Sequence, residues 1–291
     1  MTEPDLPQRL RAAAETQPEM QDWLAGLPAH VEAAAARWSL RVGPAFQPGG
    51  VASWVAPVVT PADERAVLKI GWRHWEAFHE ADGLRAWRGN GTVRLLDYVR
   101  PDERTDVLLL EACEPGTSAD RLPERDQDVV VAGLLRRLWI VPEPGSPFRP
   151  LAGMCAQWAD EVDVARARSH VGHAGIVRDG LALFRALPTE GPAAVLLTTD
   201  LHCGNVLAAR REPWLVIDPK PYVGDPTYDP LQHMLNCRER LTSDPRAFAR
   251  RMAGLLDVNA LRLQQWLFAR CVVESAHDAD LAPVARALAA V

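Results

Sequence analysis

The chain has 291 residues, of which 48% are hydrophobic and 24% are charged, a balance typical of a soluble globular protein. The net charge of −6 argues against nucleic acid as a partner, because phosphate backbones are bound by clusters of lysine and arginine. No apolar run approaches the roughly 18 residues of a membrane span, and the acidic start MTEPDLPQRL lacks the apolar segment of a signal peptide.

The first third of the chain is predicted to begin with helices and to continue as a small sheet. Residues 5–37 have helical spacing, with breaks expected near Pro18 and Pro28. From residue 40 onward, short apolar runs bounded by turn residues indicate strands, and one further segment has helical spacing. The strands are predicted over residues 40–47, 51–59, 66–70, 93–99 and 107–110, and the helix over residues 73–88. This order predicts a small antiparallel sheet lobe with one helix.

The remainder of the chain is predicted to be mainly helical. The last strand runs into a linker, which places the boundary of the first lobe near residues 112–120. We therefore expect two domains, residues 1–112 and residues 113–291, and an α+β fold class. Apolar residues three and four positions apart predict helices over residues 125–140, 151–169, 176–187, 226–240, 246–256, 259–277 and 283–290.

Residues 195–229 contain polar groups that point to phosphoryl transfer. A short apolar strand leads into a loop with Asp200, His202 and Asn205, and the next hairpin ends at Asp218. Phosphoryl transfer needs a carboxylate that orients the acceptor hydroxyl and accepts its proton. It also needs oxygen ligands that hold Mg²⁺ against the phosphates. Asp200 is the candidate catalytic base, and Asn205 and Asp218 are the candidate metal ligands.

The motif D-L-H-x-G-N-x-L at residues 200–207, followed by a strand and I-D-P, resembles the aminoglycoside phosphotransferase family. Within it, the runs I-D-P-K and G-D-P-x-Y-D most resemble the streptomycin and hydroxyurea phosphotransferases. The resemblance covers most of the chain and implies a two-lobe protein-kinase-like fold with ATP and Mg²⁺ as cofactors. The family usually has His-Gly before the loop aspartate, where this chain has Thr198-Thr199. That histidine is thought to brace the loop, so the departure bears on loop stability more than on mechanism.

The sheet lobe contains candidate nucleotide-binding residues in the order that a kinase-like fold requires. Lys69, in the third predicted strand, is expected to reach the phosphates, and the alternative is an ordinary strand lysine that reaches solvent. Its carboxylate partner is Glu80 or Glu76, and we prefer Glu80 because it resembles the helix glutamate of the family. The turn at residues 47–53 lacks a G-x-G-x-x-G motif, but its backbone amides and the Ser53 hydroxyl are candidates for phosphate contact.

Further candidates lie in the linker and beside the loop aspartate. In kinase-like folds the linker meets the adenine edge, so the carbonyl of Glu111 and the amide near Cys113 are candidates for that contact. His202 is a candidate either to donate to phosphate or to brace the loop. Lys220 could offset phosphate charge, although the prolines on both sides of it indicate a rigid exposed turn.

Other conspicuous residues have structural interpretations. Asp225 and Asp229 are expected to stabilise loops and to cap a helix that begins at Pro226. Most of the ten tryptophans are expected in the core. The five cysteines are widely spaced and form no C-x-x-C pair, which fits a reduced cytoplasm and argues against structural zinc.

The sequence therefore predicts a cytoplasmic enzyme that transfers the γ-phosphoryl group of ATP to a small hydroxyl-bearing molecule. By resemblance alone, the favoured acceptor is an aminoglycoside of the streptomycin type, which would confer antibiotic resistance. One alternative is a kinase of hydroxyurea or of another small metabolite, and a second is an inactive ATP-binding pseudokinase. We expect a monomer or weak dimer without nucleic-acid or membrane partners. The sequence leaves the phosphorylated hydroxyl and the choice between ATP and GTP open.

Overall fold

The chain folds into two compact units, each built from two segments. The computed structural model describes residues 5–168 and 174–289. The first unit contains Met1–Gly116 and Ala209–Pro213, and the second contains Thr117–Ala208 and Trp214–Val291.

Within the described residues, the strands form sheets of five, three and two strands. The five-stranded sheet belongs to the first unit, has the order β1-β2-β3-β5-β4, and is antiparallel throughout. The other two sheets, β6-β10-β7 and β8-β9, belong to the second unit. The strands are β1 (Arg41–Val42), β2 (Ser53–Val59), β3 (Arg65–Trp72), β4 (Leu95–Asp102), β5 (Thr105–Glu111), β6 (Arg149–Pro150), β7 (Val195–Leu197), β8 (Val206–Ala208), β9 (Trp214–Val216) and β10 (Tyr222–Gly224).

The helices flank the large sheet of the first unit and form most of the second unit. They are α1 (Gln8–Glu15), α2 (Pro18–Trp38), α3 (Glu80–Trp87), α4 (Glu124–Leu138), α5 (Leu151–Arg168), α6 (Ala174–Ala186), α7 (Leu231–Asn236), α8 (Arg238–Ser243), α9 (Pro245–Leu256), α10 (Ala260–Glu274) and α11 (Leu281–Ala289). No α-helix of the described part of the chain combines the length and hydropathy needed to cross a membrane.

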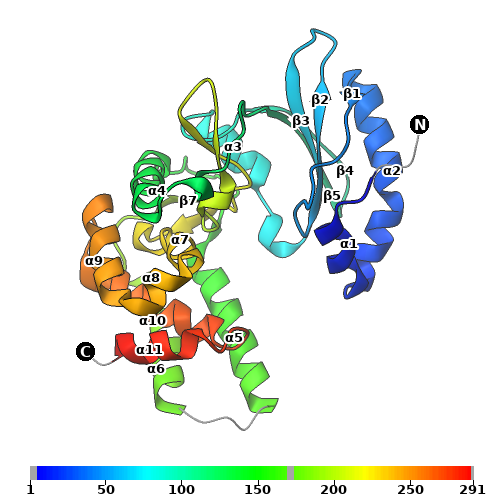
Figure 1. Cartoon of the computed structure of the whole chain (residues 1–291). Coiled ribbons are helices and arrows are strands. Elements are labelled where there is room, and N and C mark those ends of the chain that lie inside the picture. The colour runs from blue at the N-terminus through cyan, green and yellow to red at the C-terminus, as the bar shows by residue number, and fades with distance from the viewer. Residues whose placement is uncertain (1–4, 169–173, 290–291) are drawn as a thin grey trace. The chain divides into compact units, whose positions relative to one another are not determined.

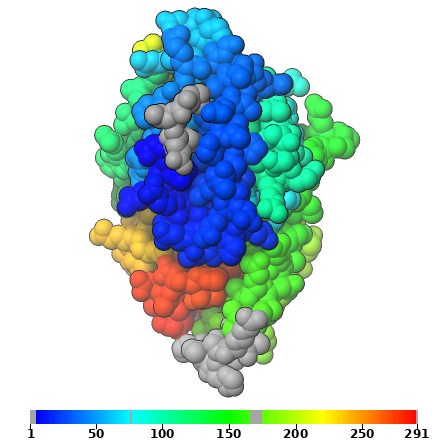
Figure 2. Space-filling view, turned by 90° about the vertical axis from the view of Figure 1, so that its right-hand side faces the viewer, coloured from blue at the N-terminus to red at the C-terminus, as the bar shows by residue number. Residues whose placement is uncertain are grey.

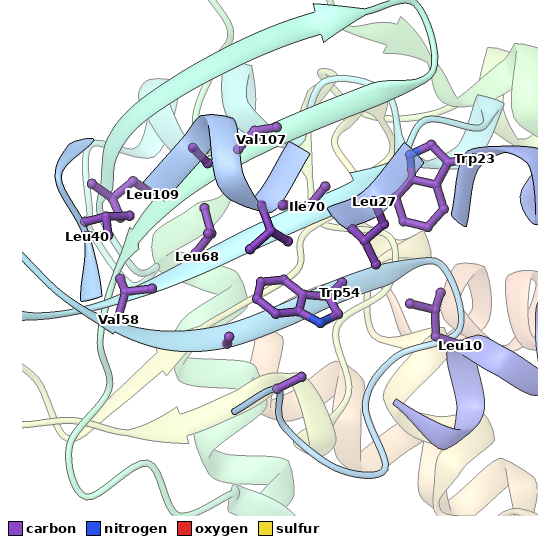
Figure 3. Packing of buried hydrophobic residues seen from close by; sticks show 14 of the residues in the cluster. Leu10, Trp23, Leu27, Leu40, Trp54, Val58, Leu68, Ile70, Val107 and Leu109 are labelled. Carbon is purple, nitrogen blue, oxygen red and sulfur yellow. The ribbon is translucent and has the colours of Figure 1, made fainter. Parts of the chain in front are cut away.

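In the first unit, α1 and α2 lie along one face of the five-stranded sheet (Figure 1). Alternate residues of each strand face these helices, because successive side chains of a strand point to opposite faces. Trp54, Leu68 and Ile70 of the sheet are buried there together with Trp23 and Leu27 of α2 (Figure 3). Each large side chain that is fully buried contributes about 1.5–3 kcal/mol, so this core holds the two helices on the sheet.

α2 continues through Pro28, so the expected break there is wrong, whereas the break near Pro18 is confirmed. A proline inside a helix costs about 3 kcal/mol, because it removes a hydrogen bond and crowds the preceding turn. Leu27 and Val31, on either side of Pro28, are buried against the sheet, and their burial offsets this cost. The outer surface of α1 and α2 is the blue region of the first unit in Figure 2.

The first predicted strand is much shorter than expected. The sequence predicts a strand over residues 40–47, but β1 has only two residues. Gly43 N and Phe46 N still donate to the β2 oxygens of Pro57 and Val55, both at 2.9 Å. Pro44 and Pro48 lack the N–H group that a strand donates to its neighbour, so the regular ladder ends with β1.

The predicted helix over residues 73–88 is also wrong in its first half. A 3₁₀ turn, η1 (Trp75–Ala77), comes first, and α3 starts only after His79, whose φ of 71° is left-handed. Glu80 is therefore the first residue of a separate helix and does not share a helical face with Glu76. The side chain of Glu76 lies outside the described residues.

The second unit is mainly helical, as predicted. α10 packs against α6, α9 and α11, and its Trp266 is fully buried. β6 and β10 were not predicted, because Arg149–Pro150 and Tyr222–Gly224 lack the run of three apolar residues that β7, β8 and β9 have. Instead of one helix over residues 226–240, the chain forms a 3₁₀ turn, η5 (Pro226–Tyr228), followed by α7 and α8, with Cys237 in non-helical backbone between these two.

Candidate active site

Lys69 and Glu80 form a buried ion pair in the first unit. Lys69 lies in β3 on the face opposite Leu68 and Ile70, and therefore away from α1 and α2. Its ammonium group donates to both carboxylate oxygens of Glu80, at 2.8 and 2.7 Å. The side chains are only 9% and 11% exposed, so water screens their attraction weakly. Glu80 is in the first turn of α3, where the helix dipole also favours a carboxylate.

Two other candidates of the first unit lie on the same sheet. Ser53 opens β2 and pairs with Gly71, two residues along β3 from Lys69, which places it on the Lys69 face. Glu111 ends β5, and its carboxylate accepts two hydrogen bonds from Arg211, at 2.8 and 2.9 Å. Burial would raise the pKa of Glu111, but these hydrogen bonds hold it below its ordinary value.

Cys113 lies two residues beyond β5. Burial raises the pKa of its thiol to about 11, so the thiol stays protonated at neutral pH. The structure therefore gives no reactive thiolate at Cys113, and the backbone near it stays the candidate for a nucleotide contact. All five cysteines are free.

Asp200, Asn205 and Asp218 lie at the ends of short strands in the second unit. β7 leads to the loop with Asp200, β8 begins directly after Asn205, and β9 is followed closely by Asp218. The antiparallel β8–β9 pairing brings the last two to one end of the hairpin, where Ile217 N donates to Asn205 O at 2.9 Å. The amide nitrogen of Asn205 donates to the backbone oxygen of Asp200 at 3.1 Å. Backbone pairing and one amide thus draw the three residues together.

Asp229 holds the start of this loop from the interior. Its carboxylate is fully buried and accepts hydrogen bonds from Thr198 N, Thr198 Oγ1 and Thr199 N, at 3.1, 3.1 and 2.7 Å. Trp139 Nε1 donates to its other oxygen at 3.0 Å. Burial raises the pKa of Asp229 to about 6, against the effect of these hydrogen bonds. Asp229 thus has the loop-stabilising role that the sequence indicates, and the residues that it holds are those between β7 and Asp200.

Thr199 has left-handed backbone, with a φ of 47°. This conformation favours glycine, and it costs other residues about 1–2 kcal/mol because Cβ crowds the backbone. Thr199 occupies the position at which the family usually has glycine. Its hydroxyl donates to the backbone oxygen of Lys220 at 2.7 Å, and its N–H donates to Asp229. These two hydrogen bonds offset the strain, so the threonine pair braces the loop without the family's histidine.

His202 lies among the charged groups of the loop. Its Nδ1 accepts a hydrogen bond from Gly204 N at 3.1 Å, so a neutral ring carries its proton on Nε2. Burial lowers the pKa of His202, whereas the nearby carboxylates of Asp200 and Asp218 raise it and Lys220 lowers it further. Both aspartates and the lysine therefore lie within electrostatic reach of one imidazole. The hydrogen bond from Gly204 to His202 braces the loop, which is one of the two roles expected of this histidine. The proton on Nε2 points to the other expected role, donation to a phosphate.

Lys220 forms an ion pair with the candidate base. Its ammonium nitrogen lies 3.0 Å from Asp200 Oδ2, and the side chains are 31% and 20% exposed, in that order. From the sequence, Lys220 was expected in a rigid exposed turn, and its ion pair with Asp200 was not predicted. The neighbouring prolines, Pro219 and Pro221, do limit the backbone as expected.

A second buried network lies behind the loop and is absent from the sequence-based candidates. Asp128 of α4 accepts hydrogen bonds from His233 Nε2, Arg240 Nη2 and Arg251 Nε, at 2.9, 2.8 and 2.7 Å. The other nitrogen of His233 lies 3.9 Å from the sulfur of Cys203, which follows His202 in the loop. The sequence contains one indication of this network. Asp128 lies at helical spacing from Val131 and Leu135, on the buried face of α4, and a carboxylate buried there needs hydrogen-bond partners.

A family model described as aminoglycoside/hydroxyurea antibiotic resistance kinase matches residues 37–281. The streptomycin 6-kinase of Streptomyces glaucescens is 40% identical over 213 residues, which is 72% of this chain and 67% of that protein. The streptomycin 6-kinase of Streptomyces griseus is 36% identical over 270 residues, or 90% and 86% of the two chains. The hydroxyurea phosphotransferase of Kitasatospora aureofaciens is 41% identical over 221 residues, 74% of this chain but only 63% of that protein.

Solved structures agree with the fold. A thermostable mutant of the aminoglycoside phosphotransferase APH(4)-Ia, in a ternary complex with ADP and hygromycin B, has a TM-score of 0.56 at 15% identity, covering 89% of this chain and 95% of that chain. LicA in complex with AMP has a TM-score of 0.59 at 9% identity, covering 90% and 96%. The predicted protein-kinase-like α+β fold is thereby confirmed. The chain belongs to the aminoglycoside/hydroxyurea antibiotic resistance kinase family and is a phosphotransferase that acts on a hydroxyl group of a small molecule.

Proposed function

We propose that the chain transfers the γ-phosphoryl group of ATP to a hydroxyl group of an aminoglycoside of the streptomycin type. The observation that carries this proposal is the grouping of Asp200, Asn205 and Asp218 at one end of the β8–β9 hairpin. The identities of 40% and 36% to two streptomycin 6-kinases support the choice of acceptor. ATP is supported by the kinase family and by the nucleotides bound to proteins of the same fold.

In this proposal Asp200 orients the acceptor hydroxyl and takes its proton as the new oxygen–phosphorus bond forms. Its side chain is 20% exposed, which lets a hydroxyl approach it. The backbone of Asp200 is tied to Asn205, so the base keeps a fixed position relative to the metal ligands. Lys69, oriented by Glu80, binds the phosphates of the nucleotide in the ground state.

Asn205 and Asp218 are suited to Mg²⁺, which prefers oxygen ligands. The nitrogen of the Asn205 amide is used toward Asp200, so its oxygen is the atom left for a cation. Within the described residues, no cluster of three or more His, Cys, Asp or Glu side chains is placed to hold a metal. This fits Mg²⁺, which is commonly held by one or two carboxylates together with substrate phosphates. When bound, the ion would neutralise charge on the phosphates.

Hydroxyurea is the second candidate acceptor. The hydroxyurea phosphotransferase of Kitasatospora aureofaciens is as similar to this chain as the streptomycin 6-kinases are, at 41% identity. Both acceptors present a hydroxyl group, but only an aminoglycoside of the streptomycin type needs a large pocket and carries positive charge. Activity toward one compound and not the other therefore decides between the two proposals.

The test is a phosphorylation assay read by mass spectrometry. Purified protein is incubated with MgATP or MgGTP and with streptomycin, hydroxyurea or other hydroxyl compounds. We expect one added phosphoryl group on streptomycin, abolished by EDTA. Asp200→Asn should lower turnover at least about 100-fold while nucleotide still binds, and Asp218→Asn should lower both turnover and nucleotide affinity. The exposed Asp179, which pairs with its neighbour Arg178, provides the control variant Asp179→Asn, expected to be fully active.

Two results would contradict the proposal. Full activity of both Asp200→Asn and Asp218→Asn would refute the residue assignment. Nucleotide binding without phosphorylation of any acceptor would favour the pseudokinase alternative.

A further inference from the structure

Lysine is nearly absent from this chain. The full sequence contains two lysines, Lys69 and Lys220, among its 32 lysine and arginine residues. Arginine presents a planar fork of donors, whereas lysine presents a compact ammonium that can rotate and follow a moving charge. Each of the two lysines is paired with a carboxylate, Lys69 with Glu80 in the first unit and Lys220 with Asp200 in the second.

The backbone of Lys220 is fastened to the catalytic loop on both sides. Its N–H donates to Thr198 O at 2.9 Å, and its carbonyl oxygen accepts the Thr199 hydroxyl at 2.7 Å. Proline on either side further restricts this backbone. The backbone of Lys220 is therefore fixed beside the loop, and its ammonium group can change direction only by rotation of the side chain.

The charges around Lys220 call for a cation. Asp200 and Asp218 both lie within electrostatic reach of His202, and the positive charge of Lys220 acts on the same imidazole. A phosphoryl group that approaches Asp200 brings further negative charge to this place, and like charges at short range repel. The Lys220 ammonium lies 3.0 Å from Asp200 Oδ2, which is close enough to the base to meet that charge, and the lysine side chain is 31% exposed, so it is not enclosed by protein.

We propose that Lys220 is a catalytic residue whose ammonium group contacts the phosphoryl group during transfer. This inference rests on the proposed function. Before the substrates bind, Lys220 pairs with Asp200. In the reaction, the acceptor oxygen forms its bond to the γ-phosphorus as the bond from that phosphorus to the bridging oxygen of ATP breaks. The hydroxyl proton passes to Asp200, and Lys220 transfers no proton but turns to the equatorial oxygens of the phosphoryl group.

The two lysines allow a matched experiment. Lys220→Met and Lys69→Met each remove one ammonium group and retain a chain of similar length. AMP-PNP represents the ground state, and ADP with aluminium fluoride represents the phosphoryl group in transfer. The affinity of the wild type and of each variant for both nucleotides is measured in the presence of Mg²⁺, together with kcat and KM for streptomycin and ATP. Lys220→Arg tests whether charge alone is sufficient.

We expect Lys220→Met to lower kcat by about 100-fold or more, the usual effect of losing a group that stabilises transition-state charge. Its affinity for AMP-PNP should stay within about threefold, while its affinity for ADP with aluminium fluoride falls by a factor similar to the loss of kcat/KM. Lys69→Met should instead weaken both nucleotides. Lys220→Arg should recover only part of the activity, because the planar fork cannot replace the ammonium at this short distance.

Three results would overturn the role of Lys220. These are a kcat of Lys220→Met within about threefold of the wild type, a faster Lys220→Met, or equal losses of affinity for both nucleotides. A faster variant would mean that the ion pair with Lys220 only keeps Asp200 from accepting the proton of the acceptor hydroxyl. If the wild type phosphorylates no acceptor, the proposed function fails, and the comparison of the two nucleotides still decides on Lys220: equal affinity of wild type and Lys220→Met for ADP with aluminium fluoride refutes it.

Discussion

Arg211 donates to both carboxylate oxygens of Glu111, at 2.8 and 2.9 Å, although 100 positions separate the two residues in the sequence. The same guanidinium donates to the backbone oxygens of Gly89 and Thr92, at 2.7 and 2.8 Å. One arginine thus joins the end of β5, the segment after α3 and the short segment Ala209–Pro213 within the first unit.

Removal of Arg211 should destabilise the first unit. The side chains of Arg211 and Glu111 are 22% and 18% exposed, so Arg211→Met leaves a largely buried carboxylate without its cation. We expect a loss of about 2–4 kcal/mol in the free energy of unfolding, measured by urea denaturation. The control is Arg41→Met, because the Arg41–Asp63 pair is 67% and 84% exposed and should contribute less than about 1 kcal/mol. Equal effects of the two substitutions would contradict this prediction.

The stability of the second unit should depend on Asp128 and on pH. Burial would raise the pKa of Asp128, but hydrogen bonds from His233, Arg240 and Arg251 outweigh it and lower the pKa to about 2, from 3.8. A lowered pKa means that the ionised group stabilises the fold above about pH 4. This contribution is lost as the pH falls toward 2, and it amounts to about 2 kcal/mol.

The measurement is urea denaturation of the wild type and of Asp128→Asn at pH 7 and pH 3. The difference in unfolding free energy between the two proteins should be smaller at pH 3, by roughly 1–2 kcal/mol. A difference that does not change with pH would show that Asp128 does not titrate as inferred. Asp278→Asn, at an exposed pair with Arg238, is the control and should have an effect below about 1 kcal/mol at either pH.

Substitutions at Thr199 should separate backbone strain from hydrogen bonding. Thr199→Ala keeps a Cβ in left-handed backbone but loses the hydrogen bond to Lys220 O, so we expect a loss of about 1–2 kcal/mol. Thr199→Gly loses the same bond but also relieves strain worth about 1–2 kcal/mol, so it should be closer to the wild type than alanine is. Thermal unfolding of both variants gives the order. Glycine less stable than alanine would mean that Thr199 is not strained.

Glu80→Gln should weaken nucleotide binding more than an equal charge change elsewhere on α3. It leaves the buried Lys69 ammonium without its carboxylate, so the lysine is no longer held in place. We expect KM for ATP to rise by about tenfold or more, measured in steady-state assays. The control is Asp82→Asn on the same helix, since Asp82 is 34% exposed and pairs with Arg85 and His79. Asp82→Asn should leave KM within about twofold, and a similar rise in both variants would refute the specific role of Glu80.

Local patterns were sufficient to predict the positions of several site residues. Alternation in the third strand and the motif around Asp200 predicted which elements carry Lys69 and Asp200, because both patterns depend on neighbours in the sequence. The continuation of α2 through Pro28 was not predictable in this way, since it depends on the sheet beneath it. Asp229 was placed at a loop, but its partner Thr198 lies 31 positions away and follows only from the tertiary fold.

The partners of the charged groups were the hardest to predict. Lys220 and Asp200 are 20 positions apart, and their pairing follows from the hydrogen bonds of the Lys220 backbone to the loop. Arg211 has no local feature that separates it from the neighbouring Arg210. Long-range ion pairs depend on the register of strands and turns, which apolar periodicity does not encode.

The division of the β8–β9 hairpin between the two units has a consequence for biosynthesis. Its strands belong to the second unit, whereas Ala209–Pro213 at its tip belongs to the first. The ribosome must therefore add 100 further residues after Glu111 before Arg211 can reach it, and the nascent first unit stays incomplete until then. A gene fragment that ends at residue 116 would omit this arginine, so neither unit corresponds to a continuous piece that recombination could exchange with a single crossover.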